Sequence, residues 1–306
     1  MTEDEFAVYQ SLSEETEDHR WAFGTGFSDP LEGIDASVPD GVDAVALAAY
    51  CLMLGDDALI YSHRLQQWMT RLPELEEETA LANIALDLLG QARMLLARAG
   101  QAEGRGQAEG RGQSAGGGRS EDQLAFFRDE NEFRNVRLAE ALDADFAELT
   151  GRLLVFSAWR LALFGQLAGS TDPVLAAIAA KGAKELAYHR DYAAQWVIRL
   201  GDGTPVSHDK MQAALGVIWP LVDELFRTDT VVAALPGVAA DPEKLRAEVD
   251  AVLDTVLAAA TLVRPDRAPM AQVAGKAGRD GVHTEAFGYL LAELQSVARA
   301  HPDATW

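Results

Sequence analysis

The sequence contains very few of the residues that build covalent or metal-based cross-links. Cys51 is its single cysteine, which excludes an internal disulfide and a metal site made of cysteines. A chain with one cysteine fits the reducing environment of the cytoplasm. The 306 residues are enough for one large domain or two small ones. Because disulfides are excluded, an apolar core has to supply the stability.

Long apolar segments are also missing. The longest uninterrupted apolar run, residues 44–54, has eleven residues and ends at Gly55. A membrane-spanning helix needs about 20 such residues, and the chain does not open on a basic segment followed by an apolar one, as a secretory signal does. The sequence therefore predicts a cytoplasmic protein without a membrane segment.

Positive charge is scarce. The chain has 26 Lys and Arg residues against 48 Asp and Glu residues, a formal net charge of −22. Binding to a phosphate backbone depends on Lys and Arg, so neither nucleic acid nor an anionic membrane is an expected partner. The acidic surface either keeps the protein soluble or meets a positively charged partner subunit.

Two stretches differ in composition from a packed domain. Residues 1–42 are acidic and contain turn signals at Asp29-Pro30 and Pro39-Asp40-Gly41, which predicts a largely flexible tail. Residues 101–120 repeat the sequence QAEGRG and then become rich in glycine, which predicts a flexible loop between two helices. The remaining chain, residues 43–306, is predicted to form a single domain.

That domain is predicted to be all-α, because no segment alternates with period two for long enough to indicate a strand. Asp172-Pro173 and Asp241-Pro242 each place a capping side chain before a proline at the first helical position. The predicted helices cover residues 43–69, 75–99, 145–168, 172–200, 207–226 with a kink at Pro220, 241–262 and 284–300. Four of them have 24 to 29 residues, about 36–44 Å, which predicts a ferritin-like long-helix bundle with additional C-terminal helices.

Bundles of this kind hold two metal ions with carboxylates and two Glu-x-x-His pairs. The sequence has Asp87 in the second helix, but the imidazole position, Gly90, has no side chain. Glu185 in the fourth helix is followed by Tyr188 at that position. His189 is one residue later and about 100° away around the helix.

The other two long helices offer no better ligands. In the third helix, residues 151–171 contain no Asp, Glu or His. In the first, Asp56 and Asp57 adjoin Gly55 and are compatible with a turn or kink. The sequence therefore predicts no catalytic, cofactor-binding or metal-binding residue in this chain.

Four polar residues remain as a candidate structural seam: Asp87, Lys181, Glu185 and His189. Lys181, Glu185 and His189 follow one stripe of the fourth helix at i, i+4 and i+8. One interpretation is an exposed, self-paired helix face. The other is a buried seam in which Asp87, Lys181 and Glu185 neutralise one another and the lysine replaces a lost metal cation.

Several ordered blocks resemble one protein family. LEEETALANIALDLLGQAR from Leu75, FFRDENEFRNVRL from Phe126, WVIRLGDGT from Trp196 and GVHTEAFGYLLAEL from Gly281 through the closing HPDATW are similar to the structural C subunits of phenylacetyl-CoA epoxidases. The resemblance covers residues 43–98, 121–235 and 270–306. The acidic tail and the loop 101–120 depart from the family pattern.

The resemblance implies a non-catalytic, ferritin-like subunit of a multicomponent monooxygenase that degrades phenylacetate. Its implied partners are a homologous catalytic A subunit with a di-iron centre, a small B subunit, and an NADPH-dependent reductase with FAD and an iron–sulfur cluster. Two alternatives stay open: a di-iron oxidase in its own right, and a stand-alone acidic helical binding protein.

Overall fold

The computed structural model describes residues 31, 33–72, 74–111 and 117–304. The chain divides into two units, Met1–Glu32 and Gly33–Trp306, and the structure described below is that of the second unit. The predicted flexible tail, residues 1–42, falls outside the described residues except for Leu31 and its last ten positions. Its predicted flexibility therefore stays a prediction.

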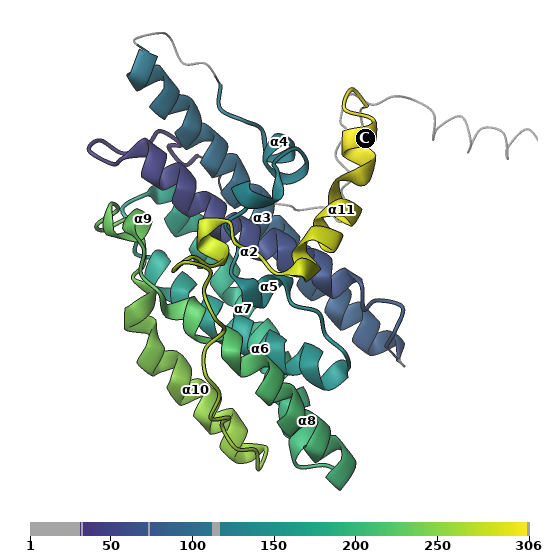
Figure 1. The fold of residues 1–306 in the computed structure, drawn as a ribbon. Helices are drawn as coiled ribbons and strands as arrows, with labels where there is room; N and C mark the ends of the chain where they lie inside the picture. The colour runs from purple at the N-terminus through teal and green to yellow at the C-terminus, as the bar shows by residue number, and fades with distance from the viewer. Residues whose placement is uncertain (1–30, 32, 73, 112–116, 305–306) are drawn as a thin grey trace, which may run out of the picture. The chain divides into compact units, whose positions relative to one another are not determined.

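Four long helices form the centre of the second unit: α2 (Ala44–Gln66), α3 (Leu75–Arg111), α6 (Phe146–Leu167) and α7 (Pro173–Gly201). α2 packs along α3, α6 packs along α7, and α3 contacts α7 (Figure 1). Among the described residues no strand forms, and the β-type pairing consists of one isolated bridge between Val273 and Lys276. The predicted all-α class is confirmed.

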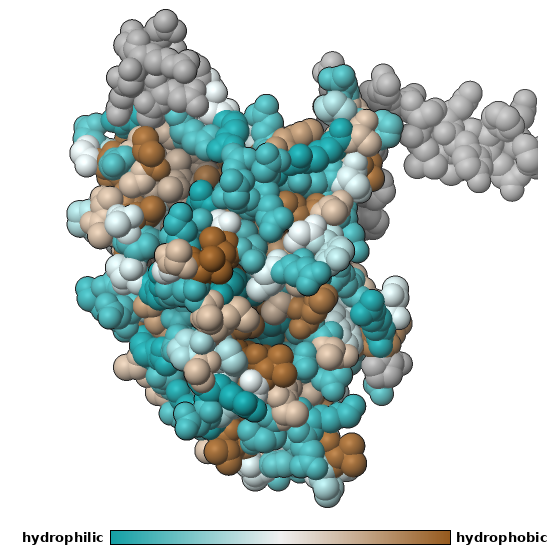
Figure 2. Space-filling model, in the orientation of Figure 1, coloured by the Kyte–Doolittle hydropathy of each residue, from teal (hydrophilic) through white to brown (hydrophobic). Residues whose placement is uncertain are grey.

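Shorter helices cover the outside of these four. α8 (Pro205–Ile218) and α10 (Arg246–Ala259) pack on α6 and α7, while α11 (Glu285–Ala300) contacts α2 and the short helices α4 and α5. On the face drawn in Figure 2, hydrophilic residues cover most of the surface and hydrophobic ones appear as separate small patches. The remaining short elements are α4 (Glu121–Phe126), α5 (Arg137–Glu140), α9 (Thr230–Ala233) and the 3-10 turns Glu130–Glu132, Trp219–Leu221, Asp223–Phe226, Pro242–Leu245 and Gly278–Asp280.

Aspartate side chains start three of the long helices, as the sequence predicts. Asp43 accepts hydrogen bonds from the backbone N–H groups of Val45 and Ala46. Asp145 caps α6 in the same way, and Asp172 accepts from the N–H of Leu175 ahead of the first helical residue Pro173. These caps satisfy N–H groups that a helix start leaves without partners.

The end of α3 differs from the prediction. The helix does not stop at Gly100 but continues to Arg111, through the first half of the predicted loop 101–120. Each helical glycine costs about 1 kcal/mol, and this segment contains several. The contacts of the segment with the rest of the protein oppose this cost. Ala102 is fully buried, and Glu103 Oε1 forms an ion pair of 2.6 Å with Arg119. Residues 112–116 of the predicted loop lie outside the described residues.

The predicted helix 207–226 is also shorter than expected. α8 begins at Pro205, because Thr204 and Ser207 cap each other reciprocally, and it ends at Ile218. Two 3-10 turns follow instead of a kinked helix, and Pro220 lies in the first of them. Proline has no N–H to donate and clashes with the preceding turn, which ends the α-helical pattern.

Asp56 and Asp57 lie within the continuous helix α2 and are fully buried, so the expected turn or kink is wrong. The neighbouring Gly55 serves a different purpose. A Cβ at Gly55 would lie 3.0 Å from Cδ2 of Leu96, so the glycine allows α2 and α3 to approach closely.

Two described helices, α2 and the Leu75–Arg105 part of α3, are long and apolar enough to cross a membrane by length and composition alone. Most of the apolar stretch of α2 is buried inside the protein, as in the core helix of a globular domain. The two helices are therefore weak indicators of a membrane span.

Candidate functional site: the polar interior of the bundle

A line of hydrogen-bonded polar side chains joins α6 to α3 and α7. The Nε of Arg160 donates to Oε1 of Gln91 at 3.0 Å, and Nε2 of Gln91 donates to Oε2 of Glu185 at 3.0 Å. Lys181 Nζ lies 3.6 Å from Oε1 of Glu185. We call Arg160, Gln91, Glu185 and Lys181 the interior relay, because they connect the centre of the bundle to its surface.

Arg160 is the buried end of the interior relay. Its side chain is inaccessible to solvent, and both terminal nitrogens donate to the carbonyl oxygen of Leu54 in α2 at 3.2 Å. The guanidinium carbon lies 4.6 Å from the ring centre of Phe164 and 5.8 Å from that of Phe156. Burial lowers the pKa of Arg160 to about 10, and the nearby Asp57 opposes this effect. Arg160 therefore remains a cation at neutral pH.

Gly182 makes room for this arrangement. A Cβ at Gly182 would lie 2.6 Å from Cε2 of Phe164 and 3.2 Å from Cδ of Gln91. Only a residue without a side chain lets the ring and the amide pack against α7 at this point. The glycine is therefore part of the geometry that encloses Arg160.

The predicted seam separates into two pairs. Nε2 of His189 lies 3.0 Å from Oδ2 of Asp87, with the histidine buried and the aspartate partly exposed. Lys181 contacts Glu185 rather than Asp87, and 39% of its side chain is exposed. The buried-seam interpretation is therefore wrong about the lysine: the buried cation among the described residues of this interior is Arg160, which the sequence analysis missed.

A sequence signal for Arg160 exists. Among residues 151–171 only Arg152 and Arg160 are charged, and both lie in an apolar helix with few exposed positions. A charge in such a helix is buried unless it lies at the edge, and a buried charge needs partners on neighbouring helices. Gln91 follows Asp87 at four-residue spacing in α3, but the sequence does not show that it meets Arg160.

The positions where a di-iron protein would carry histidine do not face a common centre here. A Cβ at Gly90 would meet nothing within 4 Å, and Tyr188 is 52% exposed. The described residues contain no group of three carboxylate, imidazole or thiol side chains that could hold a metal ion. Since a guanidinium occupies the interior and the acidic and imidazole donors are dispersed, this set of residues does not fit a di-iron centre.

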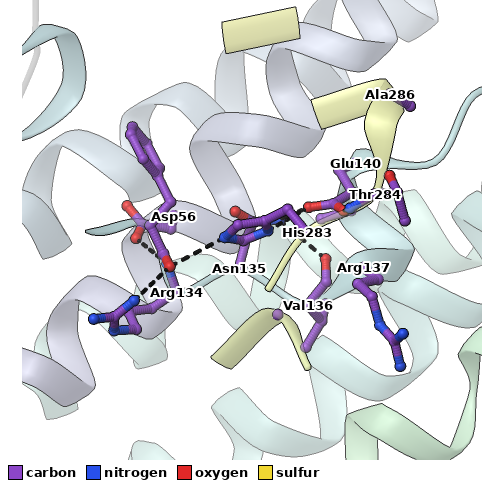
Figure 3. Close-up of polar contacts among 12 residues, drawn as sticks. Asp56, Arg134, Asn135, Val136, Arg137, Glu140, His283, Thr284 and Ala286 are labelled. Carbon is purple, nitrogen blue, oxygen red and sulfur yellow. Dashed lines mark hydrogen bonds and ion pairs between the residues drawn. The ribbon is translucent and has the colours of Figure 1, made fainter. Parts of the chain in front are cut away.

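The two buried carboxylates of α2 have other partners. Asp56 Oδ2 accepts from Nη1 of Arg128 at 3.0 Å. It also accepts from the backbone N–H of Arg134 at 2.8 Å (Figure 3). Asp57 Oδ2 lies 2.8 Å from Nη2 of Arg279, and its Oδ1 accepts from the N–H of Val136. These carboxylates fasten the segments 126–140 and 278–284 to α2.

The long-helix fold is that of a ferritin-like helical bundle, and in this chain Arg160 places a cation in its centre. The chain belongs to the phenylacetic acid catabolic protein family, whose model matches residues 35–306. It is 43% identical over 262 residues to the C subunit of the 1,2-phenylacetyl-CoA epoxidase of Escherichia coli (strain K12). The aligned region covers 85% of this chain and 99% of the relative. Family membership places the chain in the catabolism of phenylacetic acid.

Proposed function

We propose that this chain is the non-catalytic, structural subunit of a multicomponent phenylacetyl-CoA epoxidase in the cytoplasm. A relative aligned over 85% of this chain and 99% of its own length is the C subunit of such an enzyme, which supports the assignment to a complex. In this proposal the chain supports a homologous A subunit that carries the di-iron centre. A small B subunit and a reductase with FAD, an iron–sulfur cluster and NADPH complete the system.

One observation carries the non-catalytic part of the proposal. The fully buried Arg160 is bound by Gln91 and by the carbonyl oxygen of Leu54, so a fixed positive charge lies among the four long helices. A divalent metal beside this guanidinium would be repelled in a low-dielectric interior. Asp57 and Glu185 act on Arg160 through their negative charge, and each already contacts a cation of its own, Arg279 and Lys181.

Iron analysis tests the non-catalytic assignment against the alternative of a di-iron oxidase. The chain is expressed alone in iron-supplemented medium, and its iron content and optical spectrum are measured. We expect no stoichiometric iron and no oxo-bridge absorption band. Two irons per chain with such a band would contradict the proposal and favour the oxidase.

Co-expression tests the assignment to a complex against the alternative of a stand-alone acidic binding protein. The chain is expressed with a second, di-iron member of the same family, and the mixture is purified through a tag on this chain. We expect a stable complex that oxidises NADPH in the presence of phenylacetyl-CoA, B subunit and reductase. Failure of the two chains to associate would contradict the structural role.

The Arg160→Met variant adds a control within the complex. If Arg160 only balances charge, the assembled complex retains its activity once the variant has folded. A complete loss of activity from a folded, assembled variant would show that this interior takes part in catalysis, which contradicts the non-catalytic assignment.

A further inference from the structure

Two of the segments that carry the family resemblance, residues 126–138 and 281–294, meet at a buried histidine. Nδ1 of His283 lies 2.7 Å from Oε2 of Glu140, and its Nε2 lies 3.2 Å from the carbonyl oxygen of Phe133. Figure 3 shows His283 beside Glu140, Asn135 and Thr284. The side chains of His283 and Glu140 are both 0% exposed. The interior relay does not include this pair.

The hydrogen-bond partners of His283 favour one additional proton on the pair. A carbonyl oxygen and a carboxylate only accept hydrogen bonds, so each ring nitrogen needs its own N–H, whereas a neutral imidazole has one. Glu140 accepts from the Thr284 N–H at 2.6 Å and from Nδ2 of Asn135 at 2.8 Å, which favours its ionised form. The alternative is a neutral His283 beside a protonated Glu140 carboxyl. In both forms the pair contains one proton more than a neutral imidazole and an ionised carboxylate.

We propose that His283 and Glu140 form a proton-dependent latch that holds the start of α11 on the bundle. The latch binds one proton when closed. When this proton is lost, the buried carboxylate of Glu140 has no counter-charge on its histidine partner, and the lone pair of Nε2 faces the carbonyl oxygen of Phe133. Both effects favour release of the N-terminal end of α11.

The latch acts on α11 through its first residues. Thr284 is the N-cap of α11, but its own side chain makes no capping bond, and Glu140 accepts its N–H instead. The His283 ring packs on Phe287, with ring centres 4.2 Å apart, and Phe287 packs edge-on against Phe133 at 5.4 Å. A shift of His283 therefore disturbs both the cap and the aromatic contacts of α11.

The carboxylates and Arg64 around the latch already have partners. His63 of α2, which lies near Glu293 of α11, has a pKa lowered by burial, so it is neutral near neutral pH. Arg64 of α2 donates to the backbone oxygens of Glu140 and Ala286, and burial lowers its pKa only to about 10, so its charge is constant near neutral pH. Nearby carboxylates on the surrounding elements are bound by arginine or amide groups. These pairs are Asp56–Arg128, Asp57–Arg279, Asp143–Arg152, Glu224–Arg137 and Glu293–Gln67, while Asp280 accepts from the Ala277 N–H and Glu285 lies at the surface beside Tyr289.

The far end of α11 is attached through the amide of Gln295 and the guanidinium of Arg299, without a histidine. Nε2 of Gln295 donates to the carbonyl oxygens of Ala125 and Arg128 at 3.2 and 3.0 Å. Arg299 bonds to Asp129 and to the Arg128 carbonyl oxygen. Release of the latch is therefore local: the first turns of α11 loosen and its C-terminal half stays attached.

Hydrogen exchange measured by mass spectrometry tests the latch on the full chain. Exchange of peptides from residues 281–294 is followed between about pH 6 and about pH 9 and corrected for the intrinsic pH dependence of exchange. Because opening releases one proton, the opening equilibrium should rise by about tenfold per pH unit once the free imidazole is neutral. Peptides from α7 serve as the internal reference, and constant protection of residues 281–294 over the whole range would overturn the proposal.

Two variants separate the latch from a general loss of structure. Glu140→Gln and His283→Gln each remove the need for an additional proton in the closed pair, because an amide both donates and accepts, so the protection of residues 281–294 should be independent of pH. His301→Gln makes the same change at an exposed histidine and should keep the wild-type pH profile. A pH profile that persists in His283→Gln would overturn the proposal.

Nitrogen NMR of the imidazole rings provides a readout on the wild-type protein alone, should the latch variants fail to fold. The six histidines are labelled, and the His283 signal is identified by its position and by its contacts to Phe287. We expect two protonated ring nitrogens, or one beside a protonated Glu140 carboxyl, under conditions where residues 281–294 are protected from exchange. A neutral ring beside an ionised Glu140 would overturn the proposal.

Discussion

Gly182 of α7 lies against the ring of Phe164 of α6 so closely that a Cβ at Gly182 would be 2.6 Å from Cε2 of that ring. Phe164 in turn covers the guanidinium of Arg160. The backbone of α7, the aromatic ring and the buried cation are therefore stacked in the centre of the bundle. An added methyl group at Gly182 therefore has to displace the Phe164 ring.

The first prediction compares two helical glycines. Gly182→Ala should destabilise the fold by about 1 to 3 kcal/mol, because overpacking the interior forces the Phe164 ring out of place. Gly90→Ala, where a Cβ would meet nothing within 4 Å, should stabilise α3 by about 0.5 to 1 kcal/mol through helix propensity. Urea unfolding of both variants measures the difference, and equal effects of the same sign would refute it.

The second prediction concerns the hydrogen bond between Gln91 and Arg160. Gln91→Leu should cost about 1 to 3 kcal/mol, because it leaves a buried guanidinium N–H and the Glu185 carboxylate without their amide partner. Gln91→Leu combined with Arg160→Met should cost less than the sum of the single changes, since the desolvated charge is removed as well. A double-mutant cycle measures this coupling. Strict additivity would show that the two residues do not depend on each other.

The third prediction separates the two ends of the interior relay. Lys181→Ala should change the unfolding free energy by at most about 1 kcal/mol, because the lysine is partly exposed and its pair with Glu185 is long, at 3.6 Å. Glu185→Ala should cost more, since it also leaves Nε2 of the buried Gln91 without its acceptor. Thermal unfolding of the two variants ranks them. The opposite order would mean that Lys181 contributes more to stability than Glu185.

The fourth prediction concerns acid stability and His63. Burial lowers the pKa of His63, while Glu293 opposes this effect and Arg64 adds to it. As the pH falls through about 6.5, the unfolded chain binds a proton at this histidine that the folded chain does not yet bind. The contribution of His63 to stability is therefore present near pH 7 and is lost as the solution becomes acidic.

His63→Gln should accordingly reduce the loss of stability between about pH 7 and about pH 5, measured by urea unfolding at each pH. His301→Gln replaces an exposed histidine and controls for the removal of one titrating group. If both variants follow the wild-type curve, His63 does not contribute to the acid sensitivity.

The sequence predicts those features that depend on neighbours along the chain. Asp43, Asp145 and Asp172 can be recognised as caps because a helix start needs an acceptor within three residues, whatever the rest of the fold. The same local reasoning fails at Gly100. The helix continues there because of contacts with distant residues, such as the bond from Arg105 to the Val38 carbonyl oxygen. Those contacts leave no trace in the local pattern.

The candidate site shows the same limit. Missing ligand types at Gly90 and Tyr188 are visible in the sequence, because a ligand motif has a fixed spacing within one helix. The partner of a buried charge has no fixed spacing: Arg160 meets Gln91, 69 positions earlier, and Asp56 meets Arg128, 72 positions later. Periodicity leaves open whether Lys181 is the interior cation, and only the hydrogen bond between Arg160 of α6 and Gln91 of α3 identifies Arg160 instead.

The attachment of residues 126–140 and 278–284 to α2 affects how the chain folds during synthesis. Asp57 in α2 bonds to Arg279, and Arg64 in α2 bonds to the Ala286 carbonyl oxygen. Each partner lies 222 positions later in the chain and is therefore synthesised much later. Until those residues leave the ribosome, α2 presents a carboxylate and a guanidinium with part of their final partners missing. Contacts of such large separation fold slowly, and earlier intermediates expose surface that aggregates. The N-terminal helix of the bundle is thus one of the first to be made and one of the last to be completed.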